Sequence, residues 1–270
     1  MARVLRVDGR WALSGTGFGN FVPARSWRAV RHLLPNVLAR TLLKKHGAAR
    51  EVVEAGLSVT GKMGRALDFD CVKNMLSLDL VRSRGALQGA KNVAVIGDGF
   101  GFMAGLVKTI LPNGRVISIN LGKMSFFDVY HLSRAFPQEG CLLAKDATAA
   151  AASAGFVFLE AESAELLATF PVDLFINIAS MQEMDMPVVE GYFAAMRASP
   201  GARYFYCCNR MEKILPDGSP IRFDAYPWAA ADKVLVDGLC PWYEKFPTST
   251  PPFWRRFDAP LHHRLAKLAP

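Results

Sequence analysis

Short apolar strands alternate with amphipathic helices from Lys91 to Asn209. Apolar strands separated by helices of this length are typical of a parallel sheet that is covered on both faces. The pattern therefore predicts an α/β domain with a doubly wound, mostly parallel sheet over residues 89–270. The predicted elements are strand NVAVIGD, helix 101–111, strand RVISIN, helix 124–136, strand FVFLEA, helix 162–169, strand DLFINIA, helix 186–198 and strand RYFYCCN.

The preceding segment, residues 1–88, is predicted to be a helical N-terminal cap without a core of its own. Its longest pattern, SWRAVRHLLPNVLARTLLKKHG, repeats apolar residues near the helical period and ends at Gly47. Pro35 lies inside the pattern and is expected to kink or divide the helix. Further helices are predicted in AAREVVEAGLSV and DFDCVKNMLSLDLVRSRG. The apolar positions of the first pattern are Trp27, Val30, Leu33, Leu34, Val37, Leu38 and Leu42.

Two regions lack a clear pattern. The alanine-rich stretch 147–155 fits either a connector or a helical turn. The tail from Ile214 is rich in proline, and we expect it to fold back over the sheet as an edge strand and a lid.

Composition bounds the class of protein. With 270 residues, of which 51% are hydrophobic, the chain can bury a full core, either as one large α/β domain or as one such domain with an appendage. No uninterrupted apolar run reaches the roughly 18 residues that a membrane-spanning helix requires, so we expect a cytoplasmic protein. The five cysteines are scattered, without a CxxC pair, and they indicate neither a disulfide framework nor a zinc site.

The net charge of +8 is concentrated near the N-terminus, because residues 1–88 hold 15 Lys and Arg against 6 Asp and Glu. A solvated helical surface would explain this excess. Functional explanations are an anionic acceptor, an acidic membrane surface or nucleic acid. Because the chain carries neither an RNP motif nor a zinc-finger pattern, nucleic acid is not expected as a partner.

The stretch KNVAVIGDGFGFMAG marks the first strand-to-helix turn, with glycine at Gly97, Gly99 and Gly101. In an open α/β sheet, ligands bind at the carboxyl ends of the strands where the strand order reverses. Glycines permit close approach there, and the start of the next helix attracts negative charge. The turn fits a dinucleotide, through the GxGxxA match ending at Ala104, or S-adenosyl-L-methionine (SAM), and alone it does not separate them.

The fourth predicted strand helps to distinguish between a dinucleotide and SAM as the ligand. It ends in a polar cluster that includes Ser180, Gln182, Glu183 and Asp185, at the edge where an acceptor would meet a cofactor. A dehydrogenase more often leaves that edge apolar for nicotinamide. At the end of the second strand, Asn120 stands where both ligand classes usually have a carboxylate that pairs with ribose hydroxyls.

These motifs resemble the sugar O-methyltransferase family, a class I SAM-dependent group associated with decoration of bacterial polysaccharides and glycans. The resemblance covers roughly residues 90–265, and it rests most on NIASMQEM paired with a late CPW, PPF and HRL segment. Val95 and Asn120 stand where the family has acids. The matching segments are VIGDGFG, VDLFINIASMQEM, YFAAMR, YFYCCNR and CPWYEKFPTSTPPFWRRFDAPLHHRL.

The resemblance implies a Rossmann-like class I methyltransferase fold with SAM as the cofactor. It also implies a sugar hydroxyl of a glycan or sugar-containing metabolite as acceptor, with anionic and lipid-linked forms left open. Cofactor-binding roles fall on Gly97, Asp98, Gly99, Phe100, Gly101, Asn120, Glu162, Ser163 and Ser180. Substrate contacts fall on Gln182, Asn209, Arg210 and Trp242. Glu162 has a structural alternative as a first-turn residue that complements the helix dipole.

A sugar hydroxyl is a poor nucleophile, so a base within hydrogen-bond reach is expected. Glu183 is the first choice because it follows the fourth strand directly, and a structural ion pair with Arg197 or Arg210 is the alternative. His262 and His263 are the second choice, with at most one of them acting. The histidines lack metal-ligand spacing, so no metal is expected.

Two other functions stay open. One is an NAD(P)-dependent oxidoreductase that uses the GxGxxA match. The other is a catalytically silent partner subunit with a methyltransferase fold, which the missing acids at positions 95 and 120 favour. The sequence also leaves room for a homo-oligomer.

Overall fold

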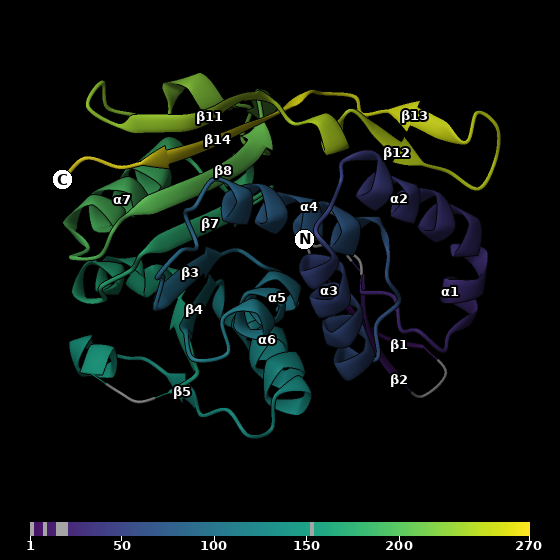
Figure 1. Cartoon of the computed structure of the whole chain (residues 1–270), viewed down its shortest axis with the longest axis horizontal. Helices are drawn as coiled ribbons and strands as arrows, with labels where there is room; N and C mark the ends of the chain where they lie inside the picture. Colours follow the sequence, from purple (N-terminus) through teal and green to yellow (C-terminus); the bar gives the residue numbers. More distant parts are fainter. Residues whose placement is uncertain (1–2, 8–9, 15–20, 152–153) are drawn as a thin grey trace.

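A central sheet organises the molecule (Figure 1). The computed structural model describes residues 3–7, 10–14, 21–151 and 154–270. Within them, eight strands form the sheet in the order β11-β14-β8-β7-β3-β4-β6-β5. The strands are β3 (Asn92–Ile96), β4 (Arg115–Asn120), β5 (Cys141–Leu143), β6 (Phe156–Glu160), β7 (Leu174–Ile178), β8 (Tyr204–Arg210), β11 (Lys233–Leu239) and β14 (Leu261–Lys267).

The strand order confirms the predicted Rossmann-like architecture. Strands β3 to β8 pair in parallel, whereas β14 runs antiparallel to both β8 and β11. From β3 the chain first builds outward through β4 to β5 at the edge, places β6 between those two, and then returns to place β7 and β8 on the other side of β3. The order therefore reverses at β3 and β7, where ligand crevices form in open α/β sheets.

Strand β3 is buried on both faces, and its alternate residues enter two different cores. Val93 and Val95 belong to the cluster that includes the N-terminal helices, α5 (Phe102–Ile110) and α6 (Gly122–Ala135). Ala94 and Ile96 belong to the cluster with η2 (Ala161–Thr169) and α7 (Met186–Ala198). This double burial explains the nearly continuous apolar strands of the sequence.

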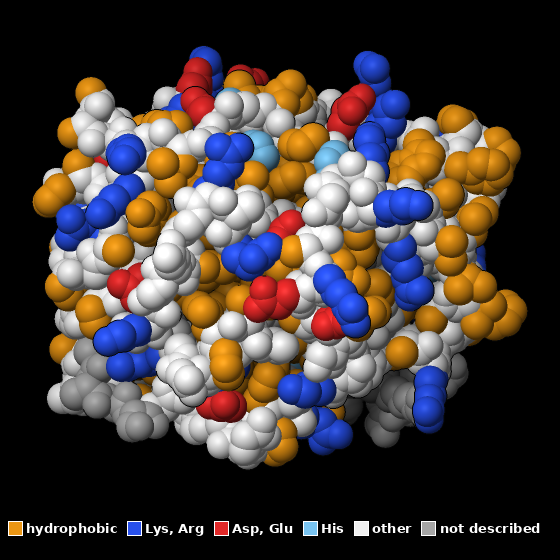
Figure 2. Space-filling model, in the orientation of Figure 1, with side chains coloured by type: hydrophobic (Ala, Val, Ile, Leu, Met, Phe, Trp, Pro, Cys, Tyr) orange, Lys and Arg blue, Asp and Glu red, His pale blue; other side chains and the backbone are white. Residues whose placement is uncertain are grey.

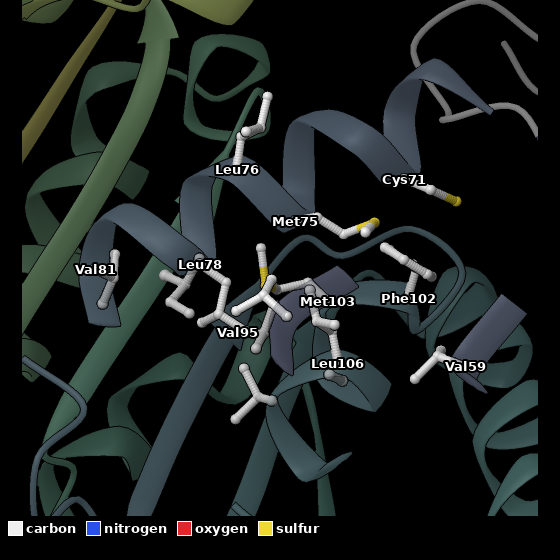
Figure 3. Packing of buried hydrophobic residues seen from close by; sticks show 14 of the residues in the cluster. Val59, Cys71, Met75, Leu76, Leu78, Val81, Val95, Phe102, Met103 and Leu106 are labelled. Carbon is white, nitrogen blue, oxygen red and sulfur yellow. The ribbon is translucent and has the colours of Figure 1, made fainter. Parts of the chain in front are cut away.

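The N-terminal helices share their core with the sheet. They are α1 (Trp27–Arg31), α2 (Leu33–Lys45), α3 (Arg50–Met63) and α4 (Phe69–Ser83). Figure 3 shows Met75 and Leu78 of α4 beside Met103 of α5 and Val95 of β3. The break expected near Pro35 falls at His32, and the proline sits in the first turn of α2, where no internal amide is lost.

Several small elements were not predicted. The backbone of β1 (Arg3–Val7) pairs with β2 (Arg10–Ser14) before the helices begin. Three exposed or half-buried residues form β5 at the sheet edge, and such a segment carries little apolar pattern. The alanine-rich stretch, for which a helical turn was one of the two expectations, contains a short 3-10 helix, η1 (Ala147–Ala151). The helix predicted over 162–169 is the 3-10 segment η2, interrupted by non-helical backbone at Ser163.

The C-terminal tail supplies more of the sheet than one edge strand. Strand β11 forms the edge, and β14 inserts between it and β8. Two short hairpins complete the tail, with the 3-10 turns η3, η4 and η5 beside them. Their bounds are β9 (Glu212–Ile214), β10 (Pro220–Arg222), β12 (Lys245–Pro247), β13 (Trp254–Arg256), η3 (Met181–Glu183), η4 (Phe223–Ala225) and η5 (Pro241–Tyr243).

Candidate functional site

A cavity of about 610 Å³ opens at the carboxyl ends of β3, β4 and β7. Its wall combines the glycine turn after β3, Asn120 at the end of β4, and the segment 179–185 after β7. The N-terminal helix α4 closes another side. Cavities of this size hold ligands as large as a nucleoside cofactor. The predicted positions Gly97, Asp98, Gly99, Phe100, Asn120, Ser180, Gln182 and Glu183 all line it.

The glycine turn needs left-handed backbone at three positions. Gly97, Gly99 and Gly101 have φ of 75°, 84° and 75°, a region that costs L-residues free energy. A Cβ on Gly97 would collide with the side chain of Ser180, whereas a Cβ on Gly99 would meet nothing within 4 Å. The turn therefore packs against the segment after β7 at its first glycine and is open to the cavity at its second.

Asp98 turns its carboxylate back onto the helix that follows. Its oxygens accept hydrogen bonds from the backbone amides of Met103 at 2.9 Å and Ala104 at 2.7 Å. Burial raises the pKa of Asp98, although these two amides favour its charged form. The start of α5 thus already has its own anionic partner.

A second buried carboxyl group lies behind Asn120. Asp128 of α6 is completely buried, and its Oδ2 accepts hydrogen bonds from Ser118 Oγ at 2.9 Å and Asn120 Nδ2 at 3.2 Å. Its Oδ1 has no hydrogen-bond partner among the described residues. Burial, together with the nearby charge of Asp98, raises the pKa of Asp128 to about 7.

Buried amides brace the carboxyl edge of β7 and β8. Asn177 Nδ2 donates to the carbonyl of Ile96 at 3.0 Å, and Asn177 Oδ1 accepts from Asn209 Nδ2 at 2.8 Å. Asn209 Oδ1 in turn accepts from the backbone amide of Gln182 at 3.1 Å. Between these contacts Ala179 is held at φ 55°, a conformation that only a well-braced segment sustains.

Glu183 sits at the cavity wall with a half-exposed carboxylate that contacts the ammonium group of Lys213. The partner is a lysine of β9, and not Arg197 or Arg210 as the structural alternative supposed. The nearby Asp185 caps α7 by accepting from the amide of Val188 at 3.3 Å.

Helix α4 adds a polar wall that the sequence interpretation missed. Asp70, Lys73 and Asn74 line the cavity from one face of this helix, and Tyr243 of η5 lies beside them. Lys73 Nζ contacts Asp70 Oδ1 at 2.7 Å and lies 4.3 Å from the Tyr243 ring centroid. The spacing of the three polar residues in the DFDCVKN segment was the available signal.

Other predicted residues lie outside the cavity wall. Trp242 is buried and donates from Nε1 to Ser77 Oγ at 3.2 Å. Asn209 is fully buried in the brace described above, and Arg210 pairs with the exposed Asp258. Gly101 faces Leu132 instead of the cavity.

The two late histidines lie on β14, away from the cavity. His262 Nε2 contacts Asp237 of β11 at 2.5 Å. His263 is buried and makes a hydrogen bond of 3.2 Å with the hydroxyl of Tyr206, and burial lowers its pKa to about 4. Neither histidine belongs to the residues that line the cavity.

Glu162 and Ser163 also lie outside the wall, although their neighbour Ala161 lines it. The charge of Glu162 adds to burial in raising the pKa of the cavity residue Tyr192, so this carboxylate is close to the lining. Within the described ranges, no three His, Cys, Asp or Glu side chains gather as metal ligands. None of the described helices is long and apolar enough to cross a bilayer.

No protein-family model and no curated protein matches the chain. Solved methyltransferase structures align with it at low identity. The mitomycin 7-O-methyltransferase MmcR aligns at 12% identity and TM-score 0.44, over 88% of this chain and 68% of that one. PH1948 from Pyrococcus horikoshii, a candidate RNA methyltransferase, aligns at 12% identity and TM-score 0.47, over 82% and 100%.

Coclaurine N-methyltransferase, solved with N-methylheliamine and S-adenosylhomocysteine (SAH), aligns at 13% identity and TM-score 0.44, over 80% of this chain and 74% of that one. At these low scores the fold of this chain is defined by its own strand order and not by the alignments.

Proposed function

We propose that this chain is a SAM-dependent O-methyltransferase that acts on a sugar hydroxyl. One observation carries the proposal: a single cavity joins the open glycine turn after β3 to the polar segment after β7. A methyl donor held at the turn and an acceptor held at residues 180–185 would share this space. Positioning two reactants in this way supplies much of the acceleration of a group transfer.

The start of α5 favours SAM over a dinucleotide. A Rossmann dinucleotide site places the pyrophosphate on the free amides of this helix end. Here the amides of Met103 and Ala104 already bind the carboxylate of Asp98. A pyrophosphate would have to displace that carboxylate and would meet its charge, whereas SAM carries no phosphate.

The remaining wall suits the parts of SAM. The open side of Gly99 leaves room for the methionine end beside the turn. Asn120 lines the expected ribose position, and the buried Asp128 behind it accepts a hydrogen bond from the Asn120 amide without lining the cavity itself. Apolar residues Leu121 and Ala161 offer a surface for a flat base.

The acceptor end supports a polyol. Asp70 and Asn74 face the cavity from α4, while Gln182 and Glu183 face it from the β7 edge. Carboxylate and amide groups accept and donate the hydrogen bonds that sugar hydroxyls make. Tyr243 adds a ring on which a pyranose could stack. Together with the sequence resemblance, this wall supports a sugar hydroxyl as the acceptor.

SAM supplies an activated methyl group, so the chain has to orient the acceptor oxygen and take its proton. Glu183 is the proposed base because its carboxylate is at the cavity wall and half exposed. Lys213 holds this carboxylate in place through their ion pair. The Asn177–Asn209 brace fixes the backbone from which Gln182 and Glu183 project.

Ligand-dependent melting tests the cofactor. A ligand that binds only the native state raises the melting temperature, by an amount equivalent to about 2.7 kcal/mol at a hundredfold excess over Kd. We expect SAH to stabilise the chain and NADH to leave its melting temperature unchanged. Stabilisation by NADH alone would favour the oxidoreductase. Gly99→Val, which fills the open side of the turn, should abolish the SAH response.

Transfer of the radiolabelled methyl group of SAM to a panel of glycosides tests the acceptor. The expected product is a methyl ether that is stable to mild base, which distinguishes it from a methyl ester. Binding of SAH without transfer to any hydroxyl would favour the silent partner subunit.

A further inference from the structure

The apolar stripe of the first N-terminal helical pattern faces solvent. Trp27, Val30, Leu33, Leu34 and Val37 are 74%, 60%, 62%, 43% and 49% exposed, respectively. We call these five residues the α1–α2 face. Their helical spacing is typical of a surface that packs against a partner, yet no described segment covers them.

The opposite side of α2 is firmly packed, so the exposure does not come from a detached helix. Pro35, Asn36, Ala39, Leu42 and Leu43 are all buried. Three of them, Ala39, Leu42 and Leu43, belong to the core that continues to the central sheet. Leu33, Leu34 and Val37 are therefore presented outward by a firmly packed helix, and Trp27 and Val30 continue the face on α1, none of whose residues is buried.

Positive charge surrounds this face. Between Phe21 and Arg50 the chain contains no Asp or Glu. Its exposed cations are Arg25, Arg28, Arg31, Arg40, Lys44, Lys45 and Arg50. Of these, Arg50 pairs with Glu54, while the structure records no ion pair between the others and a described carboxylate. The exposed side of α2 thus begins with Leu33 and Val37 and ends with Arg40 and Lys44.

The hairpin of β12 and β13 extends the same edge of the molecule. Ser249 in its loop donates to the carbonyl of Arg31 at 3.4 Å, which joins the hairpin to the end of α1. Phe253 in the loop is 44% exposed, and Arg255 and Arg256 follow it on the surface. Figure 2 shows apolar side chains gathered along this edge with Lys and Arg beside them.

We infer that the α1–α2 face binds the surface of an anionic phospholipid bilayer. An amphipathic helix with a Trp-containing apolar side and flanking Lys and Arg lies in the bilayer interface, and the cations interact with anionic headgroups. A second copy of this chain would bring the same cationic surface into contact, which like charges oppose. A bilayer supplies both an apolar layer and negative charge. This inference does not depend on the proposed methyl transfer.

Sedimentation of the full chain with vesicles tests the inference. The chain should pellet with phosphatidylcholine vesicles that contain phosphatidylglycerol and stay in the supernatant with pure phosphatidylcholine. Leu33→Ser with Val37→Ser should reduce the partition coefficient at least about tenfold, because it removes apolar burial. Arg28→Glu with Arg31→Glu should reduce it by a similar factor through charge.

Matched controls lie on other surfaces. Phe126→Ser replaces a side chain of α6 that is 67% exposed, and Arg84→Glu replaces an exposed cation after α4. Neither should change the partition coefficient. Trp27 also provides a direct probe, because its fluorescence should shift to shorter wavelength on binding and the shift should disappear in Trp27→Phe.

Three outcomes would overturn the inference. They are absence of binding by the wild-type chain, equal binding to neutral and anionic vesicles, and an equal loss in the controls. Concentration-dependent self-association that Trp27→Ser abolishes, without vesicle binding, would assign the face to a second copy instead. Thermal unfolding of each variant shows whether it is folded, and the single Trp27→Ser replaces any double variant that is not. The SAH melting response is measured separately, so failure here leaves the proposed function standing.

Discussion

Asn120 Nδ2 donates a hydrogen bond of 3.2 Å to Asp128 Oδ2, so a buried carboxyl group on α6 lies behind the strand end that lacks an acid in sequence. This contact could not be predicted from the sequence, because Asp128 is eight positions away from Asn120 and on another element. Its raised pKa, about 7, makes this pair responsive to pH.

We predict that Asp128→Asn makes the free energy of unfolding less dependent on pH. An unfolded aspartate titrates near pKa about 4, and the folded value is about 7, so the folded state binds the proton more tightly. The stability contribution of protonated Asp128 is complete below about pH 4 and is lost as the pH rises through about 7. The variant should therefore gain roughly 4 kcal/mol relative to wild type between about pH 4 and 8, because the two pKa values differ by about three units.

Urea unfolding at a series of pH values measures this difference. Asp224→Asn serves as the control, because Asp224 is exposed and pairs with Arg222 at the surface. If the difference in the free energy of unfolding between Asp128→Asn and wild type stays constant from about pH 4 to 8, the prediction is contradicted.

Gly97→Ala should be much more damaging than Gly99→Ala. Both positions have positive φ, so both substitutions carry a backbone cost of about 1–2 kcal/mol. Only the Cβ at position 97 also collides with the side chain of Ser180. Thermal unfolding of the two variants gives the comparison. Adding Ser180→Gly should recover part of the loss in Gly97→Ala, and no recovery would show that the collision is unimportant.

Glu183→Gln should reduce methyl transfer by about 10²-fold or more while the SAH melting response persists, since general-base contributions have this size. Lys213→Met is the matched variant, because it removes the ion-pair partner and keeps the carboxylate. We expect Lys213→Met to retain more activity than Glu183→Gln. Unchanged turnover in Glu183→Gln would remove Glu183 from the role of base.

The C-terminal segment is anchored by an ion pair whose loss should be costly. Arg197 of α7 donates to both oxygens of Asp232, at 2.8 and 2.9 Å, and to the carbonyl of Ala269 at 2.9 Å. The Asp232 side chain is 1% exposed, so Arg197→Met leaves a buried carboxylate without its cation and should cost about 3 kcal/mol.

Urea unfolding should also show that the double variant Arg197→Met with Asp232→Asn loses less than the sum of the single variants. Arg222→Met, which breaks the exposed pair with Asp224, should cost less than about 1 kcal/mol. Equal losses from the buried and exposed pairs would contradict the argument.

The apolar periodicity predicted most of the sheet, because double burial leaves a strong signal in strands such as β3 and β7. It predicted α7 at its observed bounds, where Asp185 caps the first turn and Pro187 follows within it. Strand β5 was not predicted, because a three-residue, partly exposed strand has no such apolar pattern.

The candidate site was predictable only where it follows strand ends. The turn at Gly97 and the segment at Ser180 lie together because parallel strands finish at one edge. The spacing of Asp70 and Lys73 in the sequence places both on one face of α4, but whether that face lines the cavity depends on tertiary packing. For His263 the sequence motif was misleading. The late motif predicted a catalytic role, but His263 pairs with Cys208 of β8 and its side chain is buried.

The position of β14 has a consequence for biosynthesis. This strand, Leu261–Lys267, separates β8 from β11, although both of those strands precede it in the chain. Until it arrives, the hydrogen-bonding groups along Tyr204–Arg210 form an open template for another polypeptide. During synthesis the chain is consequently most prone to intermolecular pairing after β8 has emerged and before β14 has paired with it, and chaperone engagement in that interval would do most to protect it.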